Sequence, residues 1–269
     1  MAVNEKRLNI TEFDFDDVKD NLKVFLKNQS EFKDYDFEGS GMSTLLDVLA
    51  YNTHYLGFNA NMLANEMFLD SASLRSSVVS HAKTLGYEVT SARAPIATVN
   101  VALSTTDSSK TMPAGTAFST TVDDVSYQYV TIADITASGA GAEVKFNNVK
   151  IYEGTYITSK YLVDTSDVAQ RFLLPDSRVD TSTLKVQVQN SASDSTVATY
   201  TKATDISQIS STSSVYFLQE VENGRHEIYF GDGNVSKALS DGNIVILNYV
   251  VTNKTASNGA STFSAPSSI

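Results

Sequence analysis

The sequence predicts an α+β protein in which an N-terminal α-helical arm of about three helices precedes a mainly antiparallel β body. Up to about residue 93, apolar residues recur with the 3.6-residue period of an amphipathic helix. Beyond Pro95 the apolar period falls to two, as at Val99 and Val101, which is typical of half-buried strands. We therefore expect a partner-bundling helical arm at 1–93 and a β-rich body at 94–269.

The first helix is expected from near Asp14 to near Asn28, because acidic residues near its start favour the positive N-terminal end of a helix. Its apolar face comprises Phe15, Val18, Leu22, Phe25 and Leu26. An acidic linker at 32–41 follows, and Gly39 and Gly41 break the helical pattern there. Because glycine frees the backbone, these two residues are hinge candidates between the first and second helices.

The second helix, expected from about Ser43 to about Leu69, carries apolar residues on more than one side. One stripe, at spacings of three, four or seven, comprises Met42, Leu45, Leu49, Leu56, Ala60, Leu63 and Met67. A second set lies off that stripe and comprises Leu46, Tyr51, Phe58, Met62, Phe68 and Leu69. Apolar residues on several faces need several packing partners, so the stripe is the candidate partner-binding surface.

The third helix is short. Ser71 and Ser73 are its candidate N-caps, because a serine side chain accepts a hydrogen bond from the first free amides of a helix. The helix is expected to end near Leu85, with Gly86 as the C-cap, because glycine readily adopts the left-handed conformation found there.

Alternating apolar residues predict strands in the body at 116–121, 125–132, 143–152, 155–163, 183–189, 215–220, 226–230 and 243–251. The MPAG segment predicts a type I turn with Pro113 in its second position and Gly115 in its fourth. Residues 137–145 fit a turn between strands, and the Ser/Thr-rich stretch 190–214 fits a polar edge hairpin plus a loop. The last residues, 257–269, read as an open tail.

Composition and motifs argue against several functional classes. The 20 basic and 31 acidic residues give a net charge of −11, which does not suit a nucleic-acid groove. Without cysteine there is no disulfide or thiolate zinc site, and no uncharged apolar run is long enough to span a bilayer. His54, His81 and His226 lack metal-site spacing, and nucleophile-elbow and phosphate-loop motifs are absent. We therefore expect no enzyme, cofactor or metal, and no nucleic-acid or membrane partner.

Two Asp-Gly turns form the sharpest local motif of the body. Gly231, Asp232 and Gly233 follow a strand end, and Asp241 opens the second turn. A calcium loop around the two aspartates is one interpretation, but the alternating acids and closing glutamate of an EF-hand loop are absent. The motif therefore predicts structural turns that use the positive φ of glycine.

Four stretches are specific in combination. They are DYDFEGSGMSTLLDVLAYN continuing to LGYEVTSARAP, the turn TMPAGTAFST, the strand pair KIYEGTYITSKYLVD, and EIYFGDGN leading to GNIVILNYVVTNKTASNGA. Together they resemble the baseplate J-like family, most closely its baseplate wedge proteins from T-even-like contractile bacteriophages. In that family the proline-glycine turn opens a β domain, and the FGDG turn precedes a strand ending in an aromatic residue. Tyr249 stands in that place here.

The resemblance implies structural work in a virion, in a tail baseplate assembled in the host cytoplasm. Such wedge proteins pair as two copies per wedge and bundle their N-terminal helices with another long wedge protein. They link wedges into a ring around the hub that rearranges on sheath contraction, and a sheath-initiator-type protein lies near the bundle. Family members are much longer and dimerise through a C-terminal part, so the resemblance implies that residues 1–269 are the N-terminal portion of a longer protein.

A β-rich carbohydrate- or receptor-binding tail protein is the alternative, because phage adhesins are also rich in β structure, serine and threonine. A sugar-binding platform needs exposed aromatic residues, usually including tryptophan, and this chain has no tryptophan. Its 13 Tyr and 13 Phe mostly fall on alternating or helical-stripe positions, which favours packing. A tail-associated glycosidase is the third possibility, and no motif supports it.

Overall fold

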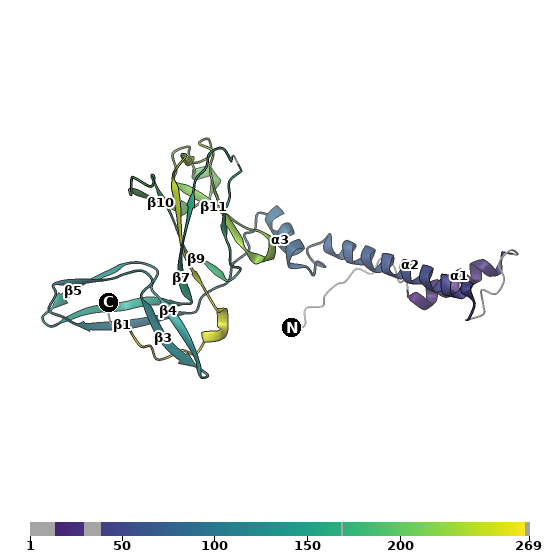
Figure 1. Ribbon diagram of the computed structural model, residues 1–269, viewed down its shortest axis with the longest axis horizontal. Helices are drawn as coiled ribbons and strands as arrows, with labels where there is room; N and C mark the ends of the chain where they lie inside the picture. The colour runs from purple at the N-terminus through teal and green to yellow at the C-terminus, as the bar shows by residue number, and fades with distance from the viewer. Residues whose placement is uncertain (1–13, 30–38, 168, 267–269) are drawn as a thin grey trace. The chain divides into compact units, whose positions relative to one another are not determined.

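The computed structural model describes residues 14–29, 39–167 and 169–266. These residues form an α+β protein in which three α-helices precede a body of thirteen strands, so the predicted fold class is confirmed. The chain divides into two compact units, one extending to Val89 and one from Thr90 onward (Figure 1).

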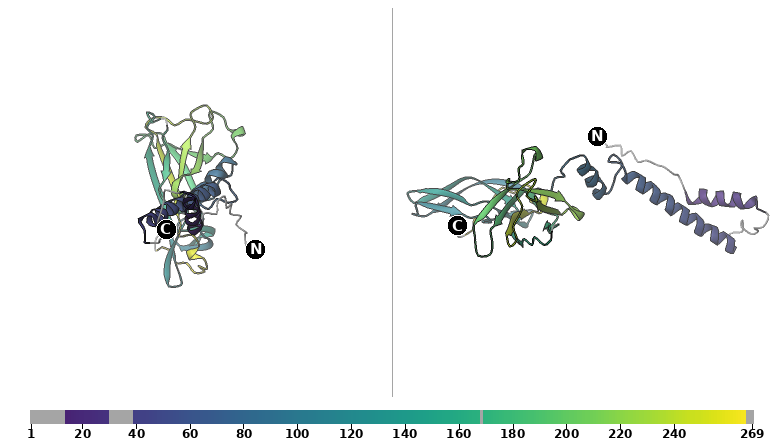
Figure 2. Two further views of the ribbon diagram at one scale, coloured as in Figure 1. Left: turned by 90° about the vertical axis from the view of Figure 1, so that its right-hand side faces the viewer. Right: turned by 90° about the horizontal axis from the view of Figure 1, so that it is seen from above.

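In the helical unit, α1 (Phe15–Lys27) lies beside α2 (Gly41–Glu66), as Figure 2 shows. Asp14 caps α1 by accepting a hydrogen bond of 2.7 Å from the amide of Phe15. An ion pair of 2.5 Å between Lys19 and Asp47 joins the two helices. Their buried residues are Val18 and Leu26 of α1 and Ser43, Leu46, Ala50 and Gly57 of α2. The first helix is confirmed, but Phe25 of its expected apolar face is 63% exposed.

Helix α3 (Arg75–Thr84) begins at a corner held by the last residue of α2. The carboxylate of Glu66 accepts hydrogen bonds from the Ser73 hydroxyl (2.7 Å), the Ser73 amide (2.9 Å) and the Leu74 amide (3.2 Å). Hydrogen bonds from the Ser77 and Ser73 hydroxyls lower the pKa of Glu66 to about 2. The expected N-caps Ser71 and Ser73 are therefore wrong, because Leu74 is the N-cap residue and Glu66 supplies the acceptor from the preceding helix.

Helix α3 ends near Leu85 as expected, but the expected C-cap Gly86 is one residue too late. Leu85 is the C-cap, and Gly86 follows with φ +75°. The Gly86 amide bonds the Lys83 carbonyl and the Tyr87 amide bonds the Ala82 carbonyl, both at 2.9 Å. These are the two hydrogen bonds of a Schellman motif, which leaves few carbonyls of the last turn without a partner.

The first sheet of the body is antiparallel and follows the order β2-β5-β6-β4-β3, with β1 paired to the other edge of β6. Its strands are β1 (Ile96–Ser104), β2 (Ser109–Met112), β3 (Ala117–Val122), β4 (Val125–Val130), β5 (Ile135–Ala140) and β6 (Glu143–Glu153). Its core contains Met112, Phe118, Tyr129, Val144, Phe146, Val149 and Ile151. The expected turn within 137–145 is confirmed between β5 and β6, where Gly141 has φ +77°.

The second sheet follows the order β7-β13-β9-β10-β11-β12-β8 and is antiparallel except for the β10–β11 pair. Its strands are β7 (Thr155–Leu162), β8 (Phe172–Leu174), β9 (Val179–Gln189), β10 (Val197–Lys202), β11 (Val215–Glu220), β12 (His226–Phe230) and β13 (Ile244–Val251). The two end strands meet, because the Tyr161 hydroxyl donates to the Leu173 carbonyl (2.5 Å) and its ring lies 5.8 Å from that of Phe172. The sheet therefore curls around one core.

The two sheets are joined where β6 passes into β7. Gly154 has φ +123°, and a Cβ there would lie 2.1 Å from the Val251 carbonyl oxygen, so only glycine fits. The fully buried carboxyl group of Glu153 accepts hydrogen bonds from the Thr252 hydroxyl (2.6 Å), the Asn253 amide (2.9 Å) and the Asn253 side chain (2.8 Å). The end of β6 is thereby tied to the segment that leaves β13.

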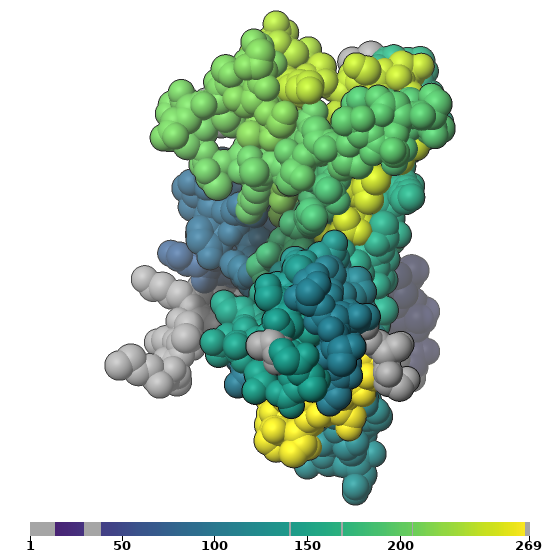
Figure 3. Space-filling model, turned by 90° about the vertical axis from the view of Figure 1, so that its left-hand side faces the viewer, coloured from purple at the N-terminus to yellow at the C-terminus, as the bar shows by residue number. Residues whose placement is uncertain are grey.

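The segment after β13 returns to the first sheet through the short helix η3 (Lys254–Ser257). The Tyr129 hydroxyl lies 3.0 Å from the Ser257 hydroxyl, and its ring lies 5.0 Å from that of Phe263. Ser264 forms a β-bridge with Ser119, and Figure 3 shows this segment in yellow against the first sheet. The expected open tail is therefore wrong up to residue 266, because its apolar residues complete the first core.

Two further expectations need correction. The Thr116 amide donates to the Pro113 carbonyl at 3.2 Å, so the turn starts at Pro113, one residue later than predicted. Gly115 is the third residue of this turn, and its φ of +84° is that of a type II turn and not of type I. Within 190–214, β10 does form a hairpin with β9, but it also pairs with β11 and is not an edge. Strands β2, β5 and β8 lie outside every predicted strand range, and β5 takes up residues 137–140 of the expected turn segment.

Candidate protein–protein interface

Helix α2 exposes a stripe of large apolar side chains along one side. The exposed fractions are 59% for Leu45, 52% for Leu49, 61% for Leu56, 69% for Leu63 and 63% for Met67, while Met42 is half-buried. At about 100° per residue, the first five lie within an arc of roughly 40°. This stripe is the one expected from the sequence, and its binding role stays a prediction.

A second exposed stripe runs along another side of α2. It comprises Val48 (60% exposed), Tyr51 (56%), Tyr55 (48%), Phe58 (61%) and Met62 (43%). Their alternating spacings of three and four residues are those of a coiled-coil seam. The sequence reasoning misses Val48 and Tyr55, although this spacing is readable in the sequence.

Helix α1 covers only the remaining side of α2. The buried α2 residues Leu46, Ala50 and Gly57 lie on a side that is roughly 100° from the first stripe and roughly 140° from the second, at about 100° per residue. Leu46, which the sequence assigns to outside partners, is therefore packed within the unit and is 3% exposed. The two stripes together leave ten large apolar side chains uncovered, if partly buried Met42 is excluded, and burying one such side chain stabilises a complex by about 1.5–3 kcal/mol.

Charge is nearly absent from these two stripes. The charged side chains of α2 are Asp47, which pairs with Lys19, and Glu66, which holds the corner before α3. No helix in the described part of the chain is long and apolar enough to cross a membrane. Contiguous exposed apolar surface of this kind is typical of protein–protein contacts, and the heptad-like spacing suits helices as partners.

The hinge candidates lie at the start of α2. Ser40 is the N-cap and its hydroxyl accepts a hydrogen bond of 3.0 Å from the Ser43 amide. Gly41 is already helical, so the expected start at Ser43 is two residues late, and a Cβ at Gly41 would meet nothing within 4 Å. Gly39 precedes the cap, and residues 32–38 of the expected linker lie outside the described residues. A hinge here stays a prediction.

The Asp-Gly segment after β12 is a bend held by local hydrogen bonds. Gly233 has φ +91°, and its amide donates to the Ser236 carbonyl at 2.9 Å. Asp232 accepts from the Asn234 amide (2.9 Å), and this hydrogen bond lowers the pKa of Asp232. A Cβ at Gly231 would lie 2.0 Å from the Ser236 hydroxyl, so the backbone approaches closely there.

The candidate metal and catalytic residues are dispersed in the structure. Asp241 lies in its own turn and accepts from the Thr165 amide at 3.2 Å. His81 Nε2 lies 2.9 Å from the Glu66 carbonyl oxygen at the helical corner, and His226 is buried in β12. Within the described ranges no three His, Cys, Asp or Glu side chains are grouped as metal ligands would be.

Two family models match this chain. Residues 14–87 match the helical domain of gp6-like baseplate wedge proteins, and residues 157–261 match the third domain of the bacteriophage baseplate wedge protein gp6. The baseplate wedge protein gp6 of Enterobacteria phage T4 is 32% identical over 274 residues, covering 93% of this chain and 40% of that protein. The chain thus spans less than half the length of this relative, and both stripes of α2 lie inside the first matched stretch.

Proposed function

Because the chain belongs to the gp6-like family of bacteriophage baseplate wedge proteins, we propose that its helices bundle with those of other wedge proteins. As a family member it is a structural subunit of the tail baseplate and therefore of the virion. The observation that carries the bundling is the pair of exposed apolar stripes on α2, since neither stripe is covered within the described helical unit.

The finer assembly role is part of the same proposal. The chain links wedges into a ring around the hub that rearranges on sheath contraction, and a second copy of the chain and a sheath-initiator-type protein lie at the bundle. Support comes from the separation of the two stripes, because two different helices can pack on α2 at the same time. The role is structural, with no catalytic step.

The experiment adds negative charge to one stripe. Leu49→Asp with Leu56→Asp is expected to abolish wedge assembly while the β body still folds, because both side chains are exposed in the isolated chain and buried in the complex. Burying an unpaired carboxylate costs several kcal/mol, more than one helix contact contributes. Ser76→Asp with Ser80→Asp is the matched control, since it adds the same charge at exposed positions of α3. Normal assembly of the leucine double variant would show that the stripe is no interface.

The carbohydrate-binding alternative has less support. In the described part of the β body, every Phe and Tyr side chain is buried or half-buried. Sugar-binding platforms need aromatic faces that are open to solvent. The exposed aromatic residues Tyr51, Tyr55 and Phe58 lie instead along the second stripe of α2, where they suit helix packing.

A further inference from the structure

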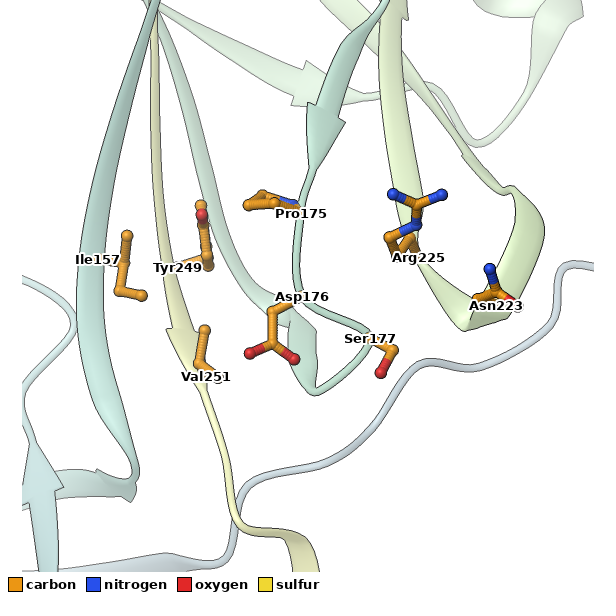
Figure 4. A pocket seen from close by; sticks show the side chains of 8 residues that line it. All are labelled: Ile157, Pro175, Asp176, Ser177, Asn223, Arg225, Tyr249 and Val251. Carbon is orange, nitrogen blue, oxygen red and sulfur yellow. The ribbon is translucent and has the colours of Figure 1, made fainter.

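A cavity of about 660 Å³ opens at one end of the second sheet (Figure 4). Its apolar group comprises Ile157 on β7 and Tyr249 and Val251 on β13. Tyr249 is 1% exposed, and its hydroxyl lies 3.0 Å from the Ser159 hydroxyl, so the half-buried Ile157 supplies most of the apolar surface that a ligand can reach. The volume is within the range of about 300–1,000 Å³ found for ligand pockets.

The opposite side of the cavity is polar and built on a rigid turn. Asn223 (φ +61°) and Gly224 (φ +72°) form the left-handed pair of a type I′ hairpin between β11 and β12. This turn positions Asn223 and Arg225, which Figure 4 shows across from Ile157 and Tyr249.

Arg225 brings a positive charge to the cavity. Its Nε donates to the Glu222 carbonyl at 3.3 Å, and no carboxylate of the described residues forms an ion pair with it. The nearby carboxylate of Asp176 is already neutralised, because Arg178 donates to it from Nη2 (2.8 Å) and Nε (3.2 Å) and lowers its pKa. Ser177 adds a rim hydroxyl that has no hydrogen-bond partner in the described structure.

We propose that this cavity binds the carboxylate of an Asp or Glu side chain from another protein chain, together with an apolar residue next to it. A guanidinium binds a carboxylate by donating two parallel hydrogen bonds to its two oxygens. One guanidinium without a carboxylate partner matches one negative charge. A phosphate carries up to two charges and favours several cations, whereas here Asp176 adds a carboxylate to the lining. The apolar group of the cavity would contact the apolar residue next to that Asp or Glu.

The test uses the isolated chain and the probe N-acetyl-aspartyl-leucine amide, with binding followed by NMR. We expect saturable shifts at the methyl groups of Ile157 and Val251. The neutral probe N-acetyl-asparaginyl-leucine amide should bind the unchanged chain at least about tenfold more weakly. The aspartyl probe should bind Arg225→Gln more weakly by the same factor, because each change removes a charge-assisted hydrogen bond. Arg171→Gln, just before β8 and outside the cavity, should bind like the unchanged chain.

Equal binding of the two probes would overturn the proposal, as would full affinity in Arg225→Gln or the absence of saturable shifts at the cavity. If Arg225→Gln fails to melt like the unchanged chain, the comparison of the two probes on the unchanged chain decides. The site lies on the second sheet and the assay needs no assembled particle. Its failure therefore leaves the proposed role of α2 intact, and the failure of α2 in assembly leaves this site intact.

Discussion

Replacing Glu153 by alanine is expected to weaken the joint between the two sheets of the body. The Glu153 carboxyl group is fully buried and accepts three hydrogen bonds from Thr252 and Asn253, the first residues of the segment that returns to the first sheet. Alanine would leave the Thr252 hydroxyl and the Asn253 amide without an acceptor. The Thr252 side chain has no access to water, so solvent cannot replace the lost partner.

The magnitude follows from these contacts. A buried donor that loses its acceptor costs about 1–3 kcal/mol, and Glu153→Ala leaves two such donors, the Thr252 hydroxyl and the Asn253 amide. We therefore expect Glu153→Ala to lower the free energy of unfolding of the β body by about 4 kcal/mol. For a domain of this size, that corresponds to a fall in melting temperature of about 10 °C.

Thermal unfolding and amide hydrogen exchange measure this effect. Glu143→Ala is the matched control, because Glu143 is the first residue of the same strand and makes only a solvent-exposed ion pair with Lys145. The control should melt within a few degrees of the unchanged chain, while the Asn253 amide should exchange faster in Glu153→Ala alone. If both variants melt at the same temperature, the buried hydrogen bonds of Glu153 do not hold the joint.

Three further predictions concern the helical corner, the Asp-Gly turn and the hinge. The pKa of Glu66 in the folded chain, about 2, lies below its ordinary value of 4.5. The Glu66 carboxylate therefore stabilises the α2–α3 corner fully above about pH 4.5, and this stabilisation is lost as the pH falls through 2. The amide chemical shifts of the corner should show this titration, and Glu66→Gln should remove it. Gly233→Val should destabilise the body by about 1–3 kcal/mol because Gly233 has a positive φ. Asp232→Asn should change the melting temperature little. A melting temperature that rises with calcium, and no longer does so in Asp232→Asn, would refute a purely structural role. Alanine at Gly39 and Gly41 should permit wedge formation but impair sheath contraction, and particles that contract and infect normally would exclude the hinge.

Local signals in the sequence predict much of the helical unit. Asp14 locates the start of α1 and Gly86 locates the end of α3, because caps act within a few residues of a helix end. The 3.6-residue period also places the exposed leucines of the first stripe on one side of α2. It cannot show that Leu46 faces α1, because that depends on where another helix packs.

The features missed by the sequence reasoning depend on distant partners. Strand β2 is short and polar and exists through its pairing with β5, while β8 has three residues and pairs with β12. The acceptor that holds the start of α3 comes from Glu66, and Phe263 belongs to the first core because it packs on Tyr129. The Asn-Gly pair at 223–224 is a hairpin signal that can be read from the sequence. Its position beside the cavity cannot, because the cavity is formed by residues distant in the sequence.

We infer that other chains bury both stripes of α2 in the baseplate, and cysteine alkylation measures this burial. The chain has no cysteine, so Leu56→Cys and Phe58→Cys each introduce a single reactive thiol, one on each stripe. Both positions are 61% exposed in the isolated chain, where alkylation should be fast. In assembled baseplates both thiols should react at least about tenfold more slowly, because burial removes access to the reagent. Equal rates in the isolated chain and in the baseplate would contradict the account.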